Sequence, residues 1–80
     1  MDTSHQIASV APESPAAKAG VEPMDIIREI NGVSLIDIFD YYYYEDESSF
    51  DMLIEKPDQT TKMVHIEKEE GEDLGILFAN

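Results

Sequence analysis

Cysteine is absent from this chain, long apolar runs are absent as well, and basic residues are few. Without cysteine the chain can form neither a disulfide nor a thiolate metal site, so its stability depends on one modest hydrophobic core. No apolar run approaches the roughly eighteen residues of a membrane-spanning helix, and the first residues carry no basic segment followed by an apolar one. We expect a single domain over residues 1–80, monomeric when isolated, with the cytoplasm as its location.

Acidic side chains outnumber basic ones by eighteen to five, which gives a net charge of −13 at pH 7. Seven acids and no base lie between Asp37 and Glu55, and five acids surround Lys68 between Glu67 and Asp73. Such a field repels phosphates and anionic lipids within about a Debye length, so nucleic acids and membranes are poor partners. A basic or neutral polypeptide is favoured, while most of the acids are explained as solvated faces that keep a small domain soluble.

The residues from Ser14 to Gly20 mark both ends of a short helix. Ser14 can accept a hydrogen bond from a first-turn N–H, and Pro15 fits the first helical position because no N–H is needed there. Ala16 and Ala19 continue the helix, and Gly20 supplies the left-handed residue that ends it.

A buried strand and a tight turn are predicted for residues 24–32. Ile26 and Ile30 indicate a mostly buried strand, because β-branched residues favour strands. Asn31 and Gly32 are typical of hairpin turns whose residues have positive φ.

The remaining segments alternate between strand and helix patterns. Residues 35–45 repeat apolar side chains at helical spacing and predict a longer helix, with Ser34 as its N-cap. We expect one or two of its four consecutive tyrosines, residues 41–44, to be buried. Strands are expected at 5–10 with Ile7 and Val10 inward, at 24–31, at 50–55 and 62–68 as a hairpin, and at 74–78. The fold class is therefore α+β and mainly β.

The order Ser-Pro-Ala-x-x-Ala-Gly-Val-x-x-x-Asp-Ile-x-x-x-Ile-Asn-Gly resembles the central signature of PDZ domains, especially the bacterial, circularly permuted kind. Its residues here are Ser14, Pro15, Ala16, Ala19, Gly20, Asp25, Asn31 and Gly32. The resemblance implies a small, partly open β-barrel or sandwich of five to six strands with one short and one longer helix. The family usually has glycine before the aspartate, where this chain has Met24, so we expect a reshaped turn or an exposed Met24.

Residues 72–78, Glu-Asp-Leu-Gly-Ile-Leu-Phe, resemble the PDZ loop in which N–H groups around a glycine bind the terminal carboxylate of a peptide. On that resemblance the following strand pairs with the peptide through its edge. The candidate peptide-binding residues are Asp73, Leu74, Gly75, Ile76, Leu77 and Phe78, faced across a groove by Ile36, Phe39 and Tyr43. The segment equally suits an ordinary closing strand, and both interpretations stay open.

Acidic residues surround this loop, and their charge disfavours a ligand that ends there in a free carboxylate; they are Glu70, Glu72 and Asp73. We therefore expect an internal or basic peptide, or a tethered segment of the same protein. A tethered segment meets the groove at a high effective concentration.

Side chains suited to catalysis or metal binding do not form a motif. His5 and His65 lack the spacing of a zinc site, and the acidic clusters at 45–47 and 69–73 lack the spacing of an EF-hand loop. Ser14 serves as a helix cap instead of a nucleophile. We expect no catalytic residue, no metal site and no cofactor in this chain, and hence no enzyme.

Residues 5–16, 30–41 and 72–78 resemble the N-terminal PDZ-like domain of clostridial proteins of undetermined function that continue into a radical-SAM-type iron–sulfur domain. On this resemblance the parent protein would hold a [4Fe-4S] cluster and S-adenosylmethionine. The present chain would be the N-terminal part of that protein, a noncatalytic module docking its catalytic domain or a partner polypeptide. The alternative is the substrate-recognition PDZ domain of a bacterial serine protease or site-2 metalloprotease.

Overall fold

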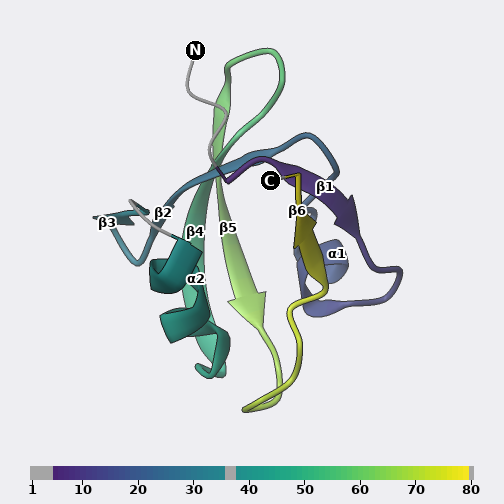
Figure 1. Cartoon of the computed structure of the whole chain (residues 1–80), viewed down its shortest axis with the longest axis vertical. Helices are drawn as coiled ribbons and strands as arrows, with labels where there is room; N and C mark the ends of the chain where they lie inside the picture. Colours follow the sequence, from purple (N-terminus) through teal and green to yellow (C-terminus); the bar gives the residue numbers. More distant parts are fainter. Residues whose placement is uncertain (1–4, 36–37, 80) are drawn as a thin grey trace.

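A computed structural model describes residues 5–35 and 38–79. In chain order these residues form β1 (Ile7–Val10), α1 (Pro15–Ala19), β2 (Ile26–Ile30), β3 (Val33–Ser34), α2 (Ile38–Glu45), β4 (Ser49–Glu55), β5 (Thr61–Glu67) and β6 (Ile76–Phe78) (Figure 1).

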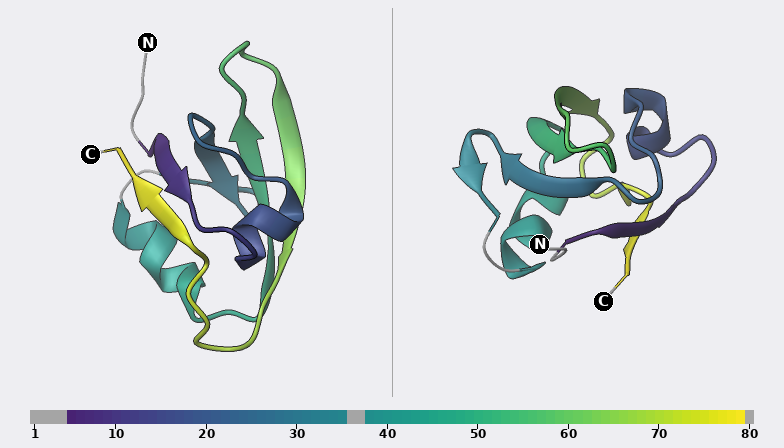
Figure 2. Two further views of the ribbon diagram at one scale, coloured as in Figure 1. Left: turned by 90° about the vertical axis from the view of Figure 1, so that its right-hand side faces the viewer. Right: turned by 90° about the horizontal axis from the view of Figure 1, so that it is seen from above.

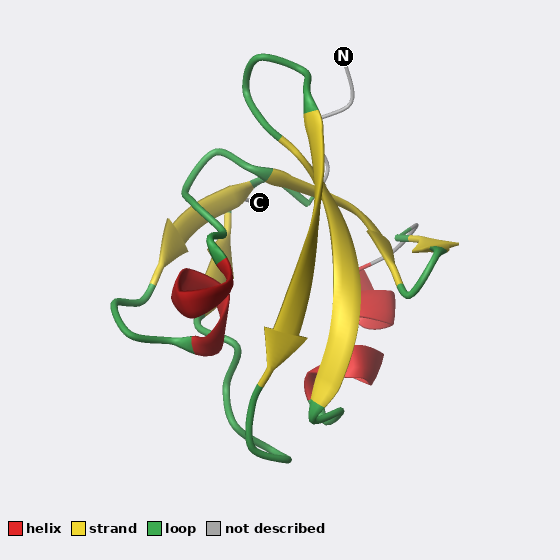
Figure 3. Ribbon diagram, turned by 180° about the vertical axis from the view of Figure 1, so that it is seen from behind, coloured by secondary structure: helices red, strands yellow, loops and turns green. Residues whose placement is uncertain are grey.

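The strands form two antiparallel sheets. One sheet has the order β3-β2-β4-β5, and the other pairs β1 with β6. The long strands β4 and β5 run side by side in the rear view (Figure 3). Apolar residues of both sheets pack into one core with residues of both helices; its buried members include Ile7, Ala16, Ile27, Ile30, Tyr41, Met52, Ile54, Ile66, Leu74 and Ile76. This architecture confirms the mainly β fold expected from the sequence.

The short helix begins and ends as the sequence predicts. Ser14 Oγ accepts a hydrogen bond from Ala17 N–H at 3.2 Å, and Pro15 occupies the first helical position. Gly20 has a φ of 96° and its N–H donates to the last turn, so the helix ends in a left-handed cap.

The turn between β2 and β3 is also confirmed. Asn31 and Gly32 both have positive φ, 52° and 81°, and the Asn31 side-chain oxygen accepts a hydrogen bond from Asp51 N–H of β4 at 2.9 Å. The hairpin continues to Ser34, which pairs with Glu29. The prediction of Ser34 as an N-cap is therefore wrong, because Ser34 belongs to strand β3 and α2 begins at Ile38.

Met24 is exposed over 56% of its surface and has a φ of 77°. The turn thus keeps a backbone conformation that favours glycine, although methionine stands there. The neighbouring Asp25 is only 1% exposed, and its Oδ2 accepts hydrogen bonds from Glu22 N–H and Lys56 Nζ, both at 2.9 Å. Burial lowers the pKa of Lys56, but hydrogen bonds to Glu22 and Asp25 outweigh it and raise that pKa overall.

The boundaries of the five expected strands lie within two residues of those predicted, whereas the short strand β3 was not predicted. Ile7 and Val10 both point toward the core, as predicted; they do so although they are three apart, because β1 shifts register between Ile7 and Ser9. Of the four tyrosines, Tyr41 is buried and Tyr44 half-buried, which agrees with the expectation of one or two buried rings. The structure begins α2 at Ile38; residues 36 and 37 of the predicted helix lie outside the described residues.

Candidate functional site

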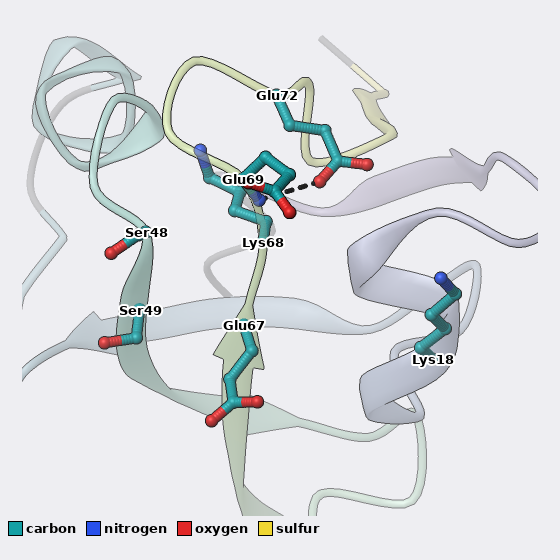
Figure 4. A pocket seen from close by; sticks show the side chains of 7 residues that line it. All are labelled: Lys18, Ser48, Ser49, Glu67, Lys68, Glu69 and Glu72. Carbon is teal, nitrogen blue, oxygen red and sulfur yellow. Dashed lines mark hydrogen bonds between the residues drawn. The ribbon is translucent and has the colours of Figure 1, made fainter.

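The loop between β5 and β6 is fastened to the start of β4 and folded on itself. Lys68 N–H donates to the Ser48 carbonyl at 2.8 Å. Glu72 N–H donates to the Glu69 carbonyl at 2.9 Å, and Glu69 N–H donates to Oε1 of Glu72 at 2.9 Å. Figure 4 shows the second of these bonds, between Glu69 and the Glu72 side chain, above the end of β5.

The same loop lies against the N-terminus of α1. Gly75 has a φ of 91°, and a Cβ at this position would come within 2.3 Å of Ser14 Cβ, so no other residue fits without movement. Ala16 N–H, in the first turn of α1, donates to the Leu74 carbonyl at 3.2 Å, and Ala11 N–H donates to the Gly75 carbonyl at 2.8 Å. The signature residues around Ser14 therefore position the loop as well as specifying the fold.

Gly75 N–H, the amide that the resemblance places at the centre of a carboxylate-binding loop, donates to Oδ1 of Asp73 at 3.0 Å. This amide is thus already hydrogen-bonded to a carboxylate within the chain. Asp73 itself is exposed, as are Glu69, Glu70 and Glu72. The loop is acidic on its solvent side.

Strand β6 pairs along one edge. Ala79 N–H donates to the Gln6 carbonyl and the Gly75 carbonyl accepts from Ala11, both on the β1 side. Because backbone groups of successive residues in an antiparallel strand point to opposite edges, those of Ile76 and Phe78 point away from β1. Among the described residues, β1 is the only strand that pairs with β6, so this second edge is free of strand pairing.

Helix α2 faces β6, as both views in Figure 2 show. The ring of Tyr41 meets that of Phe78 edge to face, with centroids 4.9 Å apart and planes at 89°, and Tyr41 is only 2% exposed. Tyr43, the predicted groove residue, is 71% exposed and its ring contacts Tyr44. Phe39 belongs to α2, and Ile36 lies outside the described residues.

The contact between Tyr41 and β6 was missed by the sequence reasoning. A signal for it existed, since Tyr41 follows Ile38 at a helical spacing of three. The run of four tyrosines obscured which ring turns inward: Leu35, Ile38, Phe39 and Tyr42 follow the spacing of one helix face, which predicts an inward Tyr42, whereas Tyr42 is exposed and Tyr41 is buried.

Residues of the predicted loop and strand divide by burial. Leu74 and Ile76 are buried in the core, Phe78 is half-buried, and Leu77 is 68% exposed on the opposite face of β6. Leu74 and Ile76 therefore anchor the segment, whereas Leu77 projects to solvent.

A polar hollow of about 590 Å³ lies below the loop. In Figure 4, Lys18 projects from α1 on one side and Ser48 and Ser49 from the start of β4 on the other, with Glu67, Lys68, Glu69 and Glu72 between them. Two ammonium groups and three carboxylates line it, so the hollow has no single sign of charge. A second hollow, of about 340 Å³, lies beside the outer face of β1 and β6, with Val10, Pro12 and Leu77 among its lining residues.

The described residues form neither a metal site nor a membrane-spanning helix. Residues 5–35 and 38–79 contain no group of three or more His, Asp or Glu side chains arranged to hold a metal ion. No helix within these ranges is long and apolar enough to cross a membrane.

A family model of the PDZ domain matches residues 6–60, which is more than half of the chain. The chain therefore belongs to the PDZ domain family, in agreement with its two small sheets and two short helices. The comparison with curated proteins gave no match. PDZ domains generally bind peptides or polypeptide segments, so family membership indicates a peptide-interaction module.

Proposed function

We propose that the chain binds an extended polypeptide segment, which adds a strand to the free edge of β6 beside α2. The observation that carries this proposal is the one-sided pairing of β6, which leaves the backbone groups of Ile76 and Phe78 directed away from β1. Main-chain hydrogen bonds along such an edge give affinity, and side chains alongside it give selectivity. Tyr41 and Phe78 supply an aromatic contact between the strand and the helix.

The order of the elements supports a circularly permuted arrangement. Strand β1, the short helix α1 and strand β2 come first, the longer helix α2 follows, and the glycine loop and β6 come last. In this arrangement the binding residues are those named from the sequence: Asp73, Leu74, Gly75, Ile76, Leu77 and Phe78 on the strand side, with Ile36, Phe39 and Tyr43 on the helix side. The contact of Gly75 with Ser14 supports a loop held in a fixed shape before a ligand arrives.

The module is noncatalytic in this proposal, and acts as a cytoplasmic docking domain of a larger protein. The resemblance of residues 5–16, 30–41 and 72–78 to clostridial proteins supports a parent with a radical-SAM-type domain, where the [4Fe-4S] cluster and S-adenosylmethionine would bind. The partner of the β6 edge is then the parent's own catalytic domain or another polypeptide. A parent gene that encodes a Cys-x-x-x-Cys-x-x-Cys motif supports this, and one that encodes a protease domain supports the protease alternative.

Two substitutions test the edge proposal. Phe78→Ala removes the ring that packs on Tyr41 and loosens the edge against α2, whereas Met63→Ser changes an exposed apolar side chain of β5, outside the proposed site. Peptides selected on the wild-type chain should bind the Phe78 variant about tenfold or more weakly and the Met63 variant with little change. Equal effects of both substitutions, measured by fluorescence anisotropy on folded variants, contradict the proposal.

A further inference from the structure

The carboxylate of Asp73 is hydrogen-bonded to the loop amide at which a peptide terminus would dock. Its Oδ1 accepts the hydrogen bond of Gly75 N–H at 3.0 Å, so the chain supplies its own carboxylate at the centre of the loop. The geometry points to Asp73 as a specificity-determining residue that turns the site away from free C-termini and toward an internal, cationic segment. This inference rests on the proposed function of the β6 edge.

A terminal carboxylate entering the loop has to displace Asp73 Oδ1 as the acceptor of the Gly75 N–H hydrogen bond. The displaced Asp73 side chain then lies next to a second carboxylate, and two like charges at close range disfavour each other. Glu69, Glu70 and Glu72 add negative charge on the same exposed loop. A segment that continues through the site as an uninterrupted backbone brings no carboxylate and leaves the hydrogen bond of Asp73 in place.

Charge complementarity identifies the side chains that such a segment carries. Every charged residue from 69 to 79 is acidic, and these acids stand at the end of β6 where an added strand passes the loop. A lysine or arginine of the ligand at that point meets the exposed carboxylates. The occupant is therefore an internal extended segment with a basic residue near the Gly75 end of β6.

Two random heptapeptide libraries displayed on phage test this inference with the full 80-residue chain as bait. In one library each peptide ends in a free carboxylate, and in the other each peptide is flanked on both sides by constant sequence. The baits are the wild type, Asp73→Ala, and the control Glu70→Gln, which removes one charge from the same loop but not the Gly75 hydrogen bond. Circular dichroism verifies that each bait is folded.

Wild-type chain should enrich the flanked library, with lysine or arginine at one fixed position. Asp73→Ala should bind peptides with free carboxylates about tenfold more tightly than the wild type does, while Glu70→Gln should change this affinity much less. If Asp73→Ala does not fold, Asp73→Asn keeps the side-chain oxygen as acceptor without its charge, and should shift the preference in the same direction.

Preference of the wild type for free carboxylates overturns the inference and leaves the proposed function standing. Equal affinity changes for the Asp73 and Glu70 variants overturn it as well, because general loop charge then explains the selectivity. Enrichment of neither library by the wild type overturns the proposed function, and the inference with it.

Discussion

Gly75→Ala is the substitution whose effect the structure specifies most closely. The added methyl group would lie 2.3 Å from Ser14 Cβ, which is attached directly to the backbone, and 2.6 Å from Ser14 Oγ, which is held by hydrogen bonds to the Ala11 carbonyl and Ala17 N–H. Gly75 also has a φ of 91°, where any residue with a Cβ is strained. Alanine at this position therefore forces the loop away from the N-terminus of α1.

The cost follows from the contacts that this movement breaks. The left-handed conformation alone costs alanine about 1–2 kcal/mol. Movement of the loop also weakens the hydrogen bonds from Ala16 N–H to Leu74 and from Ala11 N–H to Gly75, at about 1 kcal/mol each. We expect Gly75→Ala to lower the free energy of unfolding by about 3–4 kcal/mol, a large share of the roughly 4–12 kcal/mol typical of 80 residues.

Gly71→Ala is the matched control. Gly71 has a φ of 80°, close to that of Gly75, but a Cβ there meets no atom within 4 Å. This variant should lose only the conformational cost of about 1–2 kcal/mol. Urea denaturation followed by circular dichroism measures both variants, and equal losses would refute the reasoning that contact with Ser14 fixes the loop.

Three further changes test other parts of the structure. Met24→Gly should raise the free energy of unfolding by about 0.5–1 kcal/mol. Glycine relieves the backbone strain at a φ of 77°, and this gain exceeds the cost of the greater conformational entropy that glycine gives the unfolded chain; a lower thermal midpoint contradicts this. Lys56→Ala should lower stability by about 2–3 kcal/mol in urea, since the buried Asp25 loses its cationic partner; an unchanged midpoint contradicts this. The hydrogen bond to Asp51 raises the pKa of His65, so its stabilisation is present below the unfolded pKa near 6.5 and is lost as pH rises through the folded value. Asp51→Asn should weaken this dependence in urea midpoints measured between about pH 5 and 9, leaving the smaller effect of Glu67; an unaltered pH profile contradicts the assignment.

Local signals in the sequence predicted the elements that depend on local backbone chemistry. Ser14, Gly20 and Asn31 each satisfy a requirement of a cap or turn within a few residues, and the structure confirms all three. The burial of Val64 and Ile66 in β5 likewise follows from their spacing of two along the strand. These features need no knowledge of distant contacts.

Features that depend on distant contacts could not be predicted in the same way. The register shift in β1 arises from its pairing with β6, almost seventy residues later in the chain, and sequence alternation alone cannot reveal such a shift. The contact of Tyr41 with Phe78 and the closeness of Gly75 to Ser14 also join remote segments. The hydrogen bond of Asp73 to Gly75 is local, since it spans two residues, but the sequence indicated only the charge of Asp73 and its place in the loop.

The edge of β6 is the feature on which the proposed function depends, and its backbone amides report on binding directly. A ¹⁵N–¹H correlation spectrum of the chain, titrated with a peptide from the flanked library, follows each amide separately. Hydrogen bonds to an added strand should shift the Ile76 and Phe78 amides most, because their backbone groups point away from β1. Saturable shifts confined to β3 or to β5, with Ile76 and Phe78 unmoved, would contradict strand addition at this edge.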